Sequence, residues 1–358
     1  MDKTHRRGFL GAAAAVMAGI ATAPAHATPP RRRGIPLGYD NFAVRSMQWN
    51  ARQLVDHAVE LACDTLFITD FGPFEGRYDD AALGDIRRYA ADRGVALSLG
   101  SWSICPTSTT FKRDWGTAEE HLALGIRMAR ALGSKAFRVI LGNHADRLTP
   151  GGIAARIADT VAVLRTAKGR AIDAGVKIAV ENHAGDMQSR ELVRLVEEAG
   201  PEFVGVNFDS GNACWTLEDP VAALERLAPH VATTSLRDTM LWETPQGVTA
   251  QWTAMGEGCT DLNALVDVFE KRCPGVALHV ETISGFAKPF PIYEPAFWRA
   301  YPDARAEDLA GFLALAKQGR AIDPYRPPAA GDKAAAERRY QLDELARSIR
   351  HCRDVLGL

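Results

Sequence analysis

The sequence lacks the features that mark a zinc ribbon, a disulfide-dense scaffold or a nucleic-acid-binding protein. Its six cysteines are scattered and none lies in a CxxC pair, which argues against the first two classes. Lysine plus arginine (42) nearly balances aspartate plus glutamate (44), so the formal net charge is only −2. Without a basic field to attract phosphates, nucleic acid is not an expected partner.

Long apolar runs are also missing, because no segment after the N-terminus is long and apolar enough to be a membrane helix. Residues 1–27 have a basic start, a short apolar run over 9–20 and a small-residue exit, which is the layout of a secretory signal. The adjacent Arg6 and Arg7 resemble a twin-arginine signal, with an ordinary Sec signal as the alternative. We therefore expect a periplasmic or secreted protein whose mature chain starts near Thr28.

The rest of the chain alternates between strand-like apolar runs and helix-period segments. Strands are expected at 35–45, 65–70, 95–101, 136–143, 176–182, 204–210, 230–238 and 276–283. Helices are expected at 51–63, 80–93, 118–132, 152–174, 189–199, 218–228 and 261–272. Eight such units predict a closed (β/α)8 TIM barrel as a single α/β domain over residues 28–358. The alternative is an open doubly wound sheet, but no Gly-rich phosphate loop follows the first strand.

Two segments depart from the repeat. Residues 239–258 are expected to form a long loop that leaves the seventh strand at the barrel mouth. Residues 284–334 form an aromatic-rich extension that follows the last strand, so it is expected to cover the mouth, with a helix at 305–319. A final helix over about 335–355 is expected to close the ring.

Three acidic residues each end an apolar strand: Glu181 in VKIAVEN, Asp209 in VGVNFDS and Glu281 in VALHVET. The C-terminal ends of barrel strands converge on one mouth, and the two-residue period of each strand points these side chains inward. Carboxylates cannot share an apolar site at neutral pH unless a cation or protons offset them. A divalent metal (Mn, Mg or Co) suits these hard oxygen ligands and is the expected cofactor.

The alternative to a shared metal is a set of separate inward salt bridges from Lys177, Arg138 and Arg237 to the three carboxylates. An arginine buried between apolar neighbours, as Arg138 is, usually pairs with a carboxylate. Arg237 is also expected to face inward, where it could hold a carboxylate or polarise a substrate oxygen.

Three further residues are candidates for substrate binding beside Arg138 and Arg237. His183 shares the inward face of Glu181 and could bind substrate or relay a proton, although a structural role is an alternative. Asn212 follows the sixth strand and could contact sugar hydroxyls. Trp252, in the expected loop, suits sugar binding, with simple loop packing as the alternative.

Four short motifs resemble the xylose isomerase-like TIM-barrel family: VENHAG (180–185), FDSGN (208–212), TSLRDT (234–239) and HVET (279–282). This family includes sugar phosphate isomerases and epimerases, ketose 3-epimerases and enzymes of the AP endonuclease 2 type. The resemblance covers about residues 35–283 and the last helix.

The resemblance implies a metal held by a glutamate, an aspartate, a histidine and a glutamate. These positions are occupied here by Glu181, Asp209, Ser235 and Glu281. Ser235 departs from the pattern, since a hydroxyl is a poor ligand, and His279 is a possible substitute on the neighbouring strand. The resemblance also implies that Glu181 and Glu281 exchange the proton on a carbon next to a carbonyl.

The sequence therefore predicts a metal-dependent isomerase or epimerase that acts on a free sugar or sugar derivative, as a monomer or homo-oligomer. One alternative is a lyase or hydratase that eliminates the aglycone from a 3-keto-glycoside by the same proton abstraction. The other is a catalytically inactive carbohydrate-binding barrel, which the serine at position 235 favours.

Overall fold

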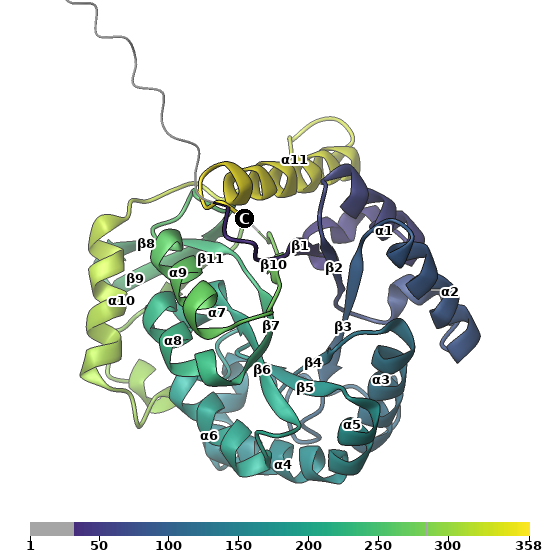
Figure 1. Cartoon of the computed structure of the whole chain (residues 1–358). Coiled ribbons are helices and arrows are strands. Elements are labelled where there is room, and N and C mark those ends of the chain that lie inside the picture. The colour runs from purple at the N-terminus through teal and green to yellow at the C-terminus, as the bar shows by residue number, and fades with distance from the viewer. Residues whose placement is uncertain (1–31, 284) are drawn as a thin grey trace, which may run out of the picture.

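The structure is a computed structural model that describes residues 32–283 and 285–358. Its centre is a parallel sheet of eight strands in the order β10-β1-β2-β3-β4-β5-β6-β7 (Figure 1). An isolated bridge between Leu236 and Val280 joins the two edges, so the expected TIM barrel is confirmed. The strands are β1 (Leu37–Asp40), β2 (Thr65–Ile68), β3 (Ala96–Ser103), β4 (Ala136–Ile140), β5 (Lys177–Glu181), β6 (Val204–Asp209), β7 (Val231–Ser235) and β10 (Leu278–Val280). The predicted signal, residues 1–27, lies outside the described residues and stays a prediction.

Helices surround these strands, largely where the sequence predicts them. They are α1 (Ala51–Glu60), α2 (Asp80–Ala91), α3 (Ala118–Leu132), α4 (Gly152–Thr166), α5 (Lys168–Ala174), α6 (Ser189–Ala199), α7 (Ser210–Cys214), α8 (Pro220–Leu227) and α9 (Leu262–Arg272). The expected single helix over 152–174 is divided at Ala167, whose N–H turns back to the carbonyl of Leu164. None of the described helices combines the length and apolarity needed to cross a bilayer.

The expected loop at 239–258 is instead mostly β-structure. β8 (Asp238–Thr244) and β9 (Gly247–Thr253) form an antiparallel hairpin, and β11 (Ala287–Phe290) from the extension pairs with β9. Strand β7 correspondingly ends at Ser235 rather than at 238. The hairpin forms because apolar side chains in both halves pack together, and Gly247 turns the chain at a φ of 148°.

The extension packs on this small sheet and on the barrel seam. It contains η5 (Phe297–Ala300), α10 (Ala306–Gln318) and the closing helix α11 (Lys333–Asp354), close to the predicted ranges. Figure 1 shows α10 beside β8 and β9, and α11 along the outside of the ring near β1. Residues Ile283 and Phe286 reach the barrel mouth, so the start of the extension contributes to the site.

Strand register determines which side chains meet at the mouth. The large apolar residues of each strand, such as Val180 and Phe208, face the helices and are fully buried. On the inner face, β5 pairs with β6 so that Glu181 lies opposite Asn207, and Asp209 lies opposite Ser235 on β7. The polar face of the strands is therefore inside the barrel, as the two-residue period predicts.

Candidate active site

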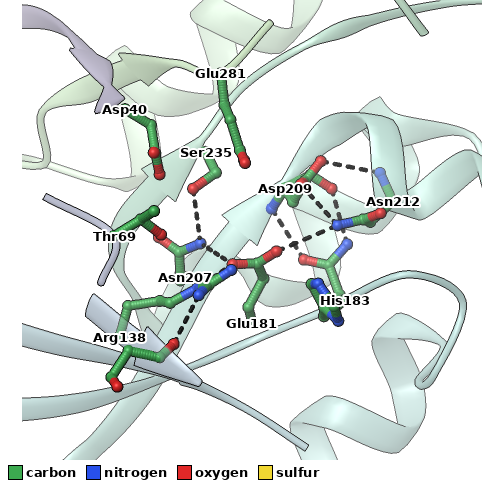
Figure 2. Close-up of polar contacts among 12 residues, drawn as sticks. Asp40, Thr69, Arg138, Glu181, His183, Asn207, Asp209, Asn212, Ser235 and Glu281 are labelled. Atoms are coloured by element: carbon green, nitrogen blue, oxygen red, sulfur yellow. Dashed lines mark hydrogen bonds and ion pairs between the residues drawn. The ribbon is translucent and has the colours of Figure 1, made fainter. Parts of the chain in front are cut away.

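Four carboxyl groups meet at the C-terminal ends of the strands. Glu181, Asp209 and Glu281 are joined by Asp40, which ends β1 beside β10 (Figure 2). All four are at most 4% exposed. Sequence reasoning did not single out Asp40, although it ends a strand in the same way as the other three.

Two arginines supply the opposing charge. Arg138 Nε donates to Glu181 Oε2 at 2.5 Å, and its Nη1 donates to the Ser101 carbonyl at 2.7 Å. Arg237 Nη2 donates to Asp209 Oδ2 at 2.5 Å and also to Glu281 Oε2. The inward salt bridges expected as the alternative to a metal are thus present for both arginines.

The third cation in that alternative, Lys177, does not take part. Its Nζ donates to the carbonyl of Pro201 at 3.0 Å, away from the mouth.

Two asparagines connect the carboxyl groups. Asn207 Nδ2 donates to Glu181 Oε2 at 2.9 Å and to Ser235 Oγ at 3.1 Å. Asn212 Nδ2 donates to Asp209 Oδ2 at 2.7 Å and to Glu181 Oε1 at 3.2 Å. Figure 2 shows Asn207 and Asn212 on opposite sides of Glu181. Asn207 was not predicted from the sequence as a site residue.

Burial and charge shift the two glutamates in opposite directions. Burial raises the pKa of Glu281 above its ordinary value, although Arg237 opposes the shift. Burial also acts to raise the pKa of Glu181, but the charges of Arg138, His183 and Arg237 and the hydrogen bond from Arg138 together outweigh it and leave that pKa below its ordinary value. Burial raises the pKa of Asp209 well above its usual range. Burial and the charge of Glu281 do the same to the pKa of Asp40. Glu181 is therefore the carboxylate that holds its charge most firmly.

The two histidines considered from sequence occupy different layers. His183 Nδ1 lies 2.7 Å from the Gly142 carbonyl, so Nδ1 carries the hydrogen in the neutral ring and Nε2 is free to accept. His279 lies deeper, with Nε2 at 3.1 Å from Thr65 Oγ1 and its ring against Phe67. Burial lowers the pKa of both rings to about 4.

A cavity of about 260 Å³ opens above the network. All five residues proposed from sequence for substrate binding line it: Arg138, His183, Asn212, Arg237 and Trp252. Glu281 is the only one of the four carboxyl groups on its wall, and the other three are fully buried. Further lining comes from Phe42, Thr69, Asp70, Trp102, Ala184, Trp215, Ile283 and Phe286.

Trp252 uses its ring faces within the protein. The Arg237 guanidinium lies 4.2 Å from its ring centre, and Trp215 stacks on it at 4.2 Å with an interplanar angle of 12°. Only part of the ring is left for substrate. Trp252 therefore holds Arg237 in place at the cavity wall, a role that the sequence did not suggest.

The residues present do not fit the metal set that the resemblance implies. Among the residues that the structure describes, no group of three or more His, Cys, Asp or Glu is arranged to hold a metal ion. Ser235 is bonded to Asn207, and Asp209 Oδ1 accepts the N–H of Asn212 as the cap of α7. Arg237 contacts Oδ2 of Asp209 and Oε2 of Glu281.

The family is established by a match to the model of the xylose isomerase-like TIM barrel over residues 55–296, and the chain belongs to that family. The uncharacterized protein YihM of Escherichia coli is 30% identical over 125 residues, 35% of this chain and 37% of that relative. The chain therefore aligns with little more than a third of YihM. A 3-oxo-isoapionate decarboxylase of Pectobacterium atrosepticum is 23% identical over 214 residues, 59% of this chain and 70% of the enzyme.

Solved structures share the fold. A D-psicose 3-epimerase in the presence of D-fructose has a TM-score of 0.58 at 16% identity, covering 90% of this chain and 100% of that one. The IolI protein with a bound zinc atom has a TM-score of 0.54 at 15% identity, covering 80% and 100%. The 3-keto-D-glucoside 4-epimerase YcjR of E. coli has a TM-score of 0.51 at 14% identity, covering 78% and 99%. Sugar-modifying enzymes thus recur among the structures that share this barrel.

Proposed function

We propose that the protein is a sugar-modifying enzyme that moves a proton on a carbon next to a carbonyl group, as isomerases and epimerases do. The observation that carries this proposal is the convergence of Glu181 and Glu281 from separate strand ends at the barrel mouth, where Glu281 lines an aromatic-walled cavity. A cavity of about 260 Å³ with a few convergent polar groups suits a small polar substrate.

The two glutamates would divide the proton transfer. Removal of the proton by one carboxylate leaves the C–H electron pair on the carbonyl oxygen, which forms an enediolate. Return of a proton to the other face of the same carbon gives an epimer, and return to the neighbouring carbon gives an isomer. Glu281 lies on the cavity wall, whereas Glu181 is fully buried and does not line the cavity, so Glu281 is the first of the two that a substrate meets.

Fixed donors around the cavity would stabilise the enediolate oxygen. The guanidinium groups of Arg138 and Arg237 and the side chain of Asn212 line the cavity, and each is held by carboxylates. Donors that are already oriented stabilise developing negative charge without reorganisation. His183 Nε2, as an acceptor, would orient a substrate hydroxyl.

Solvent proton exchange tests this function. Ketoses and keto-glycosides are incubated with the protein in D2O, and deuterium on the carbon next to the carbonyl is followed by NMR. We expect incorporation with at least one substrate, and a loss of about 10²-fold or more in Glu281→Gln and in Glu181→Gln. Glu257→Gln is the control, since Glu257 pairs with Arg347 on the surface. Sugar binding without exchange in any substrate would leave the inactive carbohydrate-binding barrel as the better account.

The second candidate is a lyase that acts on a 3-keto-glycoside, because two further cavities adjoin the central one at the barrel mouth. A cavity of about 250 Å³ shares Thr69, Asp70 and Trp102 with the central one. Another of about 360 Å³ shares Phe42 and Asp70. A substrate with a group beyond one sugar ring would have room there. Release of an aglycone, detected by mass spectrometry, distinguishes elimination from isomerisation.

We also propose, from the sequence alone, that the protein is exported by the twin-arginine route. A variant with both Arg6→Lys and Arg7→Lys should remain in the cytoplasm in cell fractionation, because the twin-arginine route needs the arginine pair. A Sec signal would tolerate the same exchange. Export of the double variant at the wild-type level would favour the Sec alternative.

A further inference from the structure

We infer that the cation of this barrel mouth is Arg237 in place of a divalent metal, and that its guanidinium contacts the substrate oxygen that gains charge. The contact with the substrate oxygen rests on the proposed function, whereas the replacement of a metal by Arg237 does not.

The first argument is position. Arg237 Nη2 lies within hydrogen-bond distance of both Asp209 Oδ2 and Glu281 Oε2. A hard metal shared by these two oxygens would lie about 2.0–2.6 Å from each, in the space that this nitrogen takes. Arg237 and a metal therefore compete for the same oxygens.

The second argument is that surrounding residues hold the Arg237 guanidinium in one position. Arg237 is 2% exposed and lies over the ring of Trp252, which stacks on Trp215. The ammonium of Lys288 lies 4.2 Å from the ring centre of Trp215, so aromatic rings separate the two cations. At Gly211, a Cβ would lie 2.2 Å from Arg237 Cγ, so any larger residue there would displace the arginine.

The third argument is charge. Glu181, Asp209 and Glu281 carry three negative charges when ionised, and Arg138 and Arg237 pair with them directly. Three carboxylates and two guanidiniums leave a formal charge of −1, while burial raises the pKa of the fourth carboxyl group, Asp40, well above its usual range and so favours its neutral form. The need for a cation, which made a metal attractive from sequence, is thus largely met by the chain itself.

The fourth argument is a free donor. Arg237 Nε is buried and has no hydrogen-bond partner within the protein, although Arg237 lines the cavity. A buried N–H without a partner is costly, and a substrate oxygen would satisfy it. The guanidinium would then donate to the carbonyl oxygen while the C–H electron pair moves onto it, and the proton leaves to a glutamate. This step needs no oxidant, reductant or further reactant.

Metal content tests the inference without turnover. The protein is purified without chelator, incubated with Mn²⁺ or Co²⁺, desalted and measured by elemental analysis. We expect well under one equivalent of metal. About one equivalent in the wild type, lost in Asp209→Asn, would overturn the inference.

A variant that removes the competitor gives a positive control. In Ser235→His/Arg237→Ala, a nitrogen ligand replaces the hydroxyl and the carboxylates lose the guanidinium. We expect this variant to gain Co²⁺ binding, seen as visible d–d absorption, after circular dichroism has shown that it is folded. If the double variant does not fold, Arg237→Ala alone is tested for the gain of binding. A folded variant that binds no more metal than the wild type would overturn the claim of competition.

Exchange activity separates this inference from the proposed function. We expect deuterium exchange to persist in EDTA and to fall about 10²-fold or more in Arg237→Lys, mostly in kcat, since lysine lacks the planar fork. Exchange that EDTA abolishes and Mn²⁺ restores would overturn the inference and keep the function. Absence of exchange from a metal-free protein would overturn the function and the substrate contact, and would leave Arg237 as the cation of a binding site.

Discussion

His279 shows how burial alone decides the chemistry of one side chain in this barrel. Its ring is 1% exposed, and burial lowers its pKa from 6.5 to about 4. An unfolded chain would take up a proton near pH 6.5, and the folded chain would not. The stability that this neutral ring contributes is therefore present above pH 6.5 and is lost as the pH falls toward 4.

We predict that His279→Gln removes this part of the pH dependence. Between pH 6.5 and 4.5 the free energy of unfolding should fall more steeply in the wild type, by about 1.4 kcal/mol per pH unit for one proton. Urea denaturation at several pH values measures the two slopes, which should coincide above pH 7. Equal slopes over the whole range would show that His279 titrates alike in both states.

Arg138 offers a second test at the level of single residues. It is 4% exposed, and its removal would leave the buried Glu181 without its main partner. We expect Arg138→Met to lower the free energy of unfolding by about 3–5 kcal/mol, since an unpaired buried charge is strongly unfavourable.

The matched double variant Arg138→Met/Glu181→Gln should recover part of that loss, because it removes the buried charge as well. Urea denaturation of the two single variants, the double variant and the wild type measures the coupling. Strictly additive losses would mean that the pair is not energetically linked.

The inward side chains could be read from the sequence, but their partners could not. Two-residue periodicity places Glu181, Asp209 and Glu281 on the inner face, and the structure has them there. Which cation meets which carboxylate depends on contacts between distant strands, as in the pairing of Arg237 with Glu281. No local pattern encodes such a contact, so the common strand-end placement favoured a shared metal, with separate ion pairs as the alternative.

At the level of elements, the strands of the barrel were predictable and the β8–β9 hairpin was not. Some barrel strands follow a helix that ends at glycine, such as β4 after α3, where Gly133 lies in the left-handed region at a φ of 78°. The hairpin contains tryptophans and threonines, but its turn lacks the residues of a common two-residue turn. The third strand of the small sheet, β11, lies more than thirty residues further along the chain. The burial that stabilises it is supplied by the extension, which sequence periodicity does not reveal.

The turn of this hairpin gives a matched test of the small sheet. A Cβ at Gly247 would lie 2.2 Å from the carbonyl oxygen of Phe290, so Gly247→Ala would push β11 away. Gly275 also has a positive φ, 77°, but nothing lies within 4 Å of its added Cβ.

We expect Gly275→Ala to cost about 1 kcal/mol of backbone strain, and Gly247→Ala at least about 2 kcal/mol more, since backbone must move. Thermal and urea denaturation compare the two. Equal losses would show that β11 adjusts freely and does not hold the hairpin over the mouth.

At the level of the whole molecule, the two ends of the described chain close the barrel together. Arg33 Nε donates to the Leu356 carbonyl at 2.9 Å, and its backbone N–H donates to that of Gly357 at 2.8 Å. Helix α11 packs beside β1 and β10, where the first and last strands of the barrel pair. The extension before α11 packs in a second cluster of apolar side chains, apart from the main core of the barrel. The extension and the closing helix are therefore stabilised by separate contacts.

The cysteines extend this argument to the compartment in which the protein is proposed to work. All six thiols are free, and five are buried. Burial raises the pKa of Cys63 and of Cys352 to about 12, and that of Cys259 to about 11. Thiolates are the reactive form, so an oxidising compartment should leave these groups intact while the barrel is folded.

We therefore predict that the exported native protein holds no disulfide and reacts slowly with Ellman's reagent at pH 8, with the partly exposed Cys259 first. In guanidinium chloride all six thiols should react, and a reductant should leave the melting temperature unchanged. Cys259→Ser is the matched variant, which should remove the fastest phase alone. A thiol count below six after denaturation, with a lower melting temperature in reductant, would show instead that a disulfide supports the exported fold.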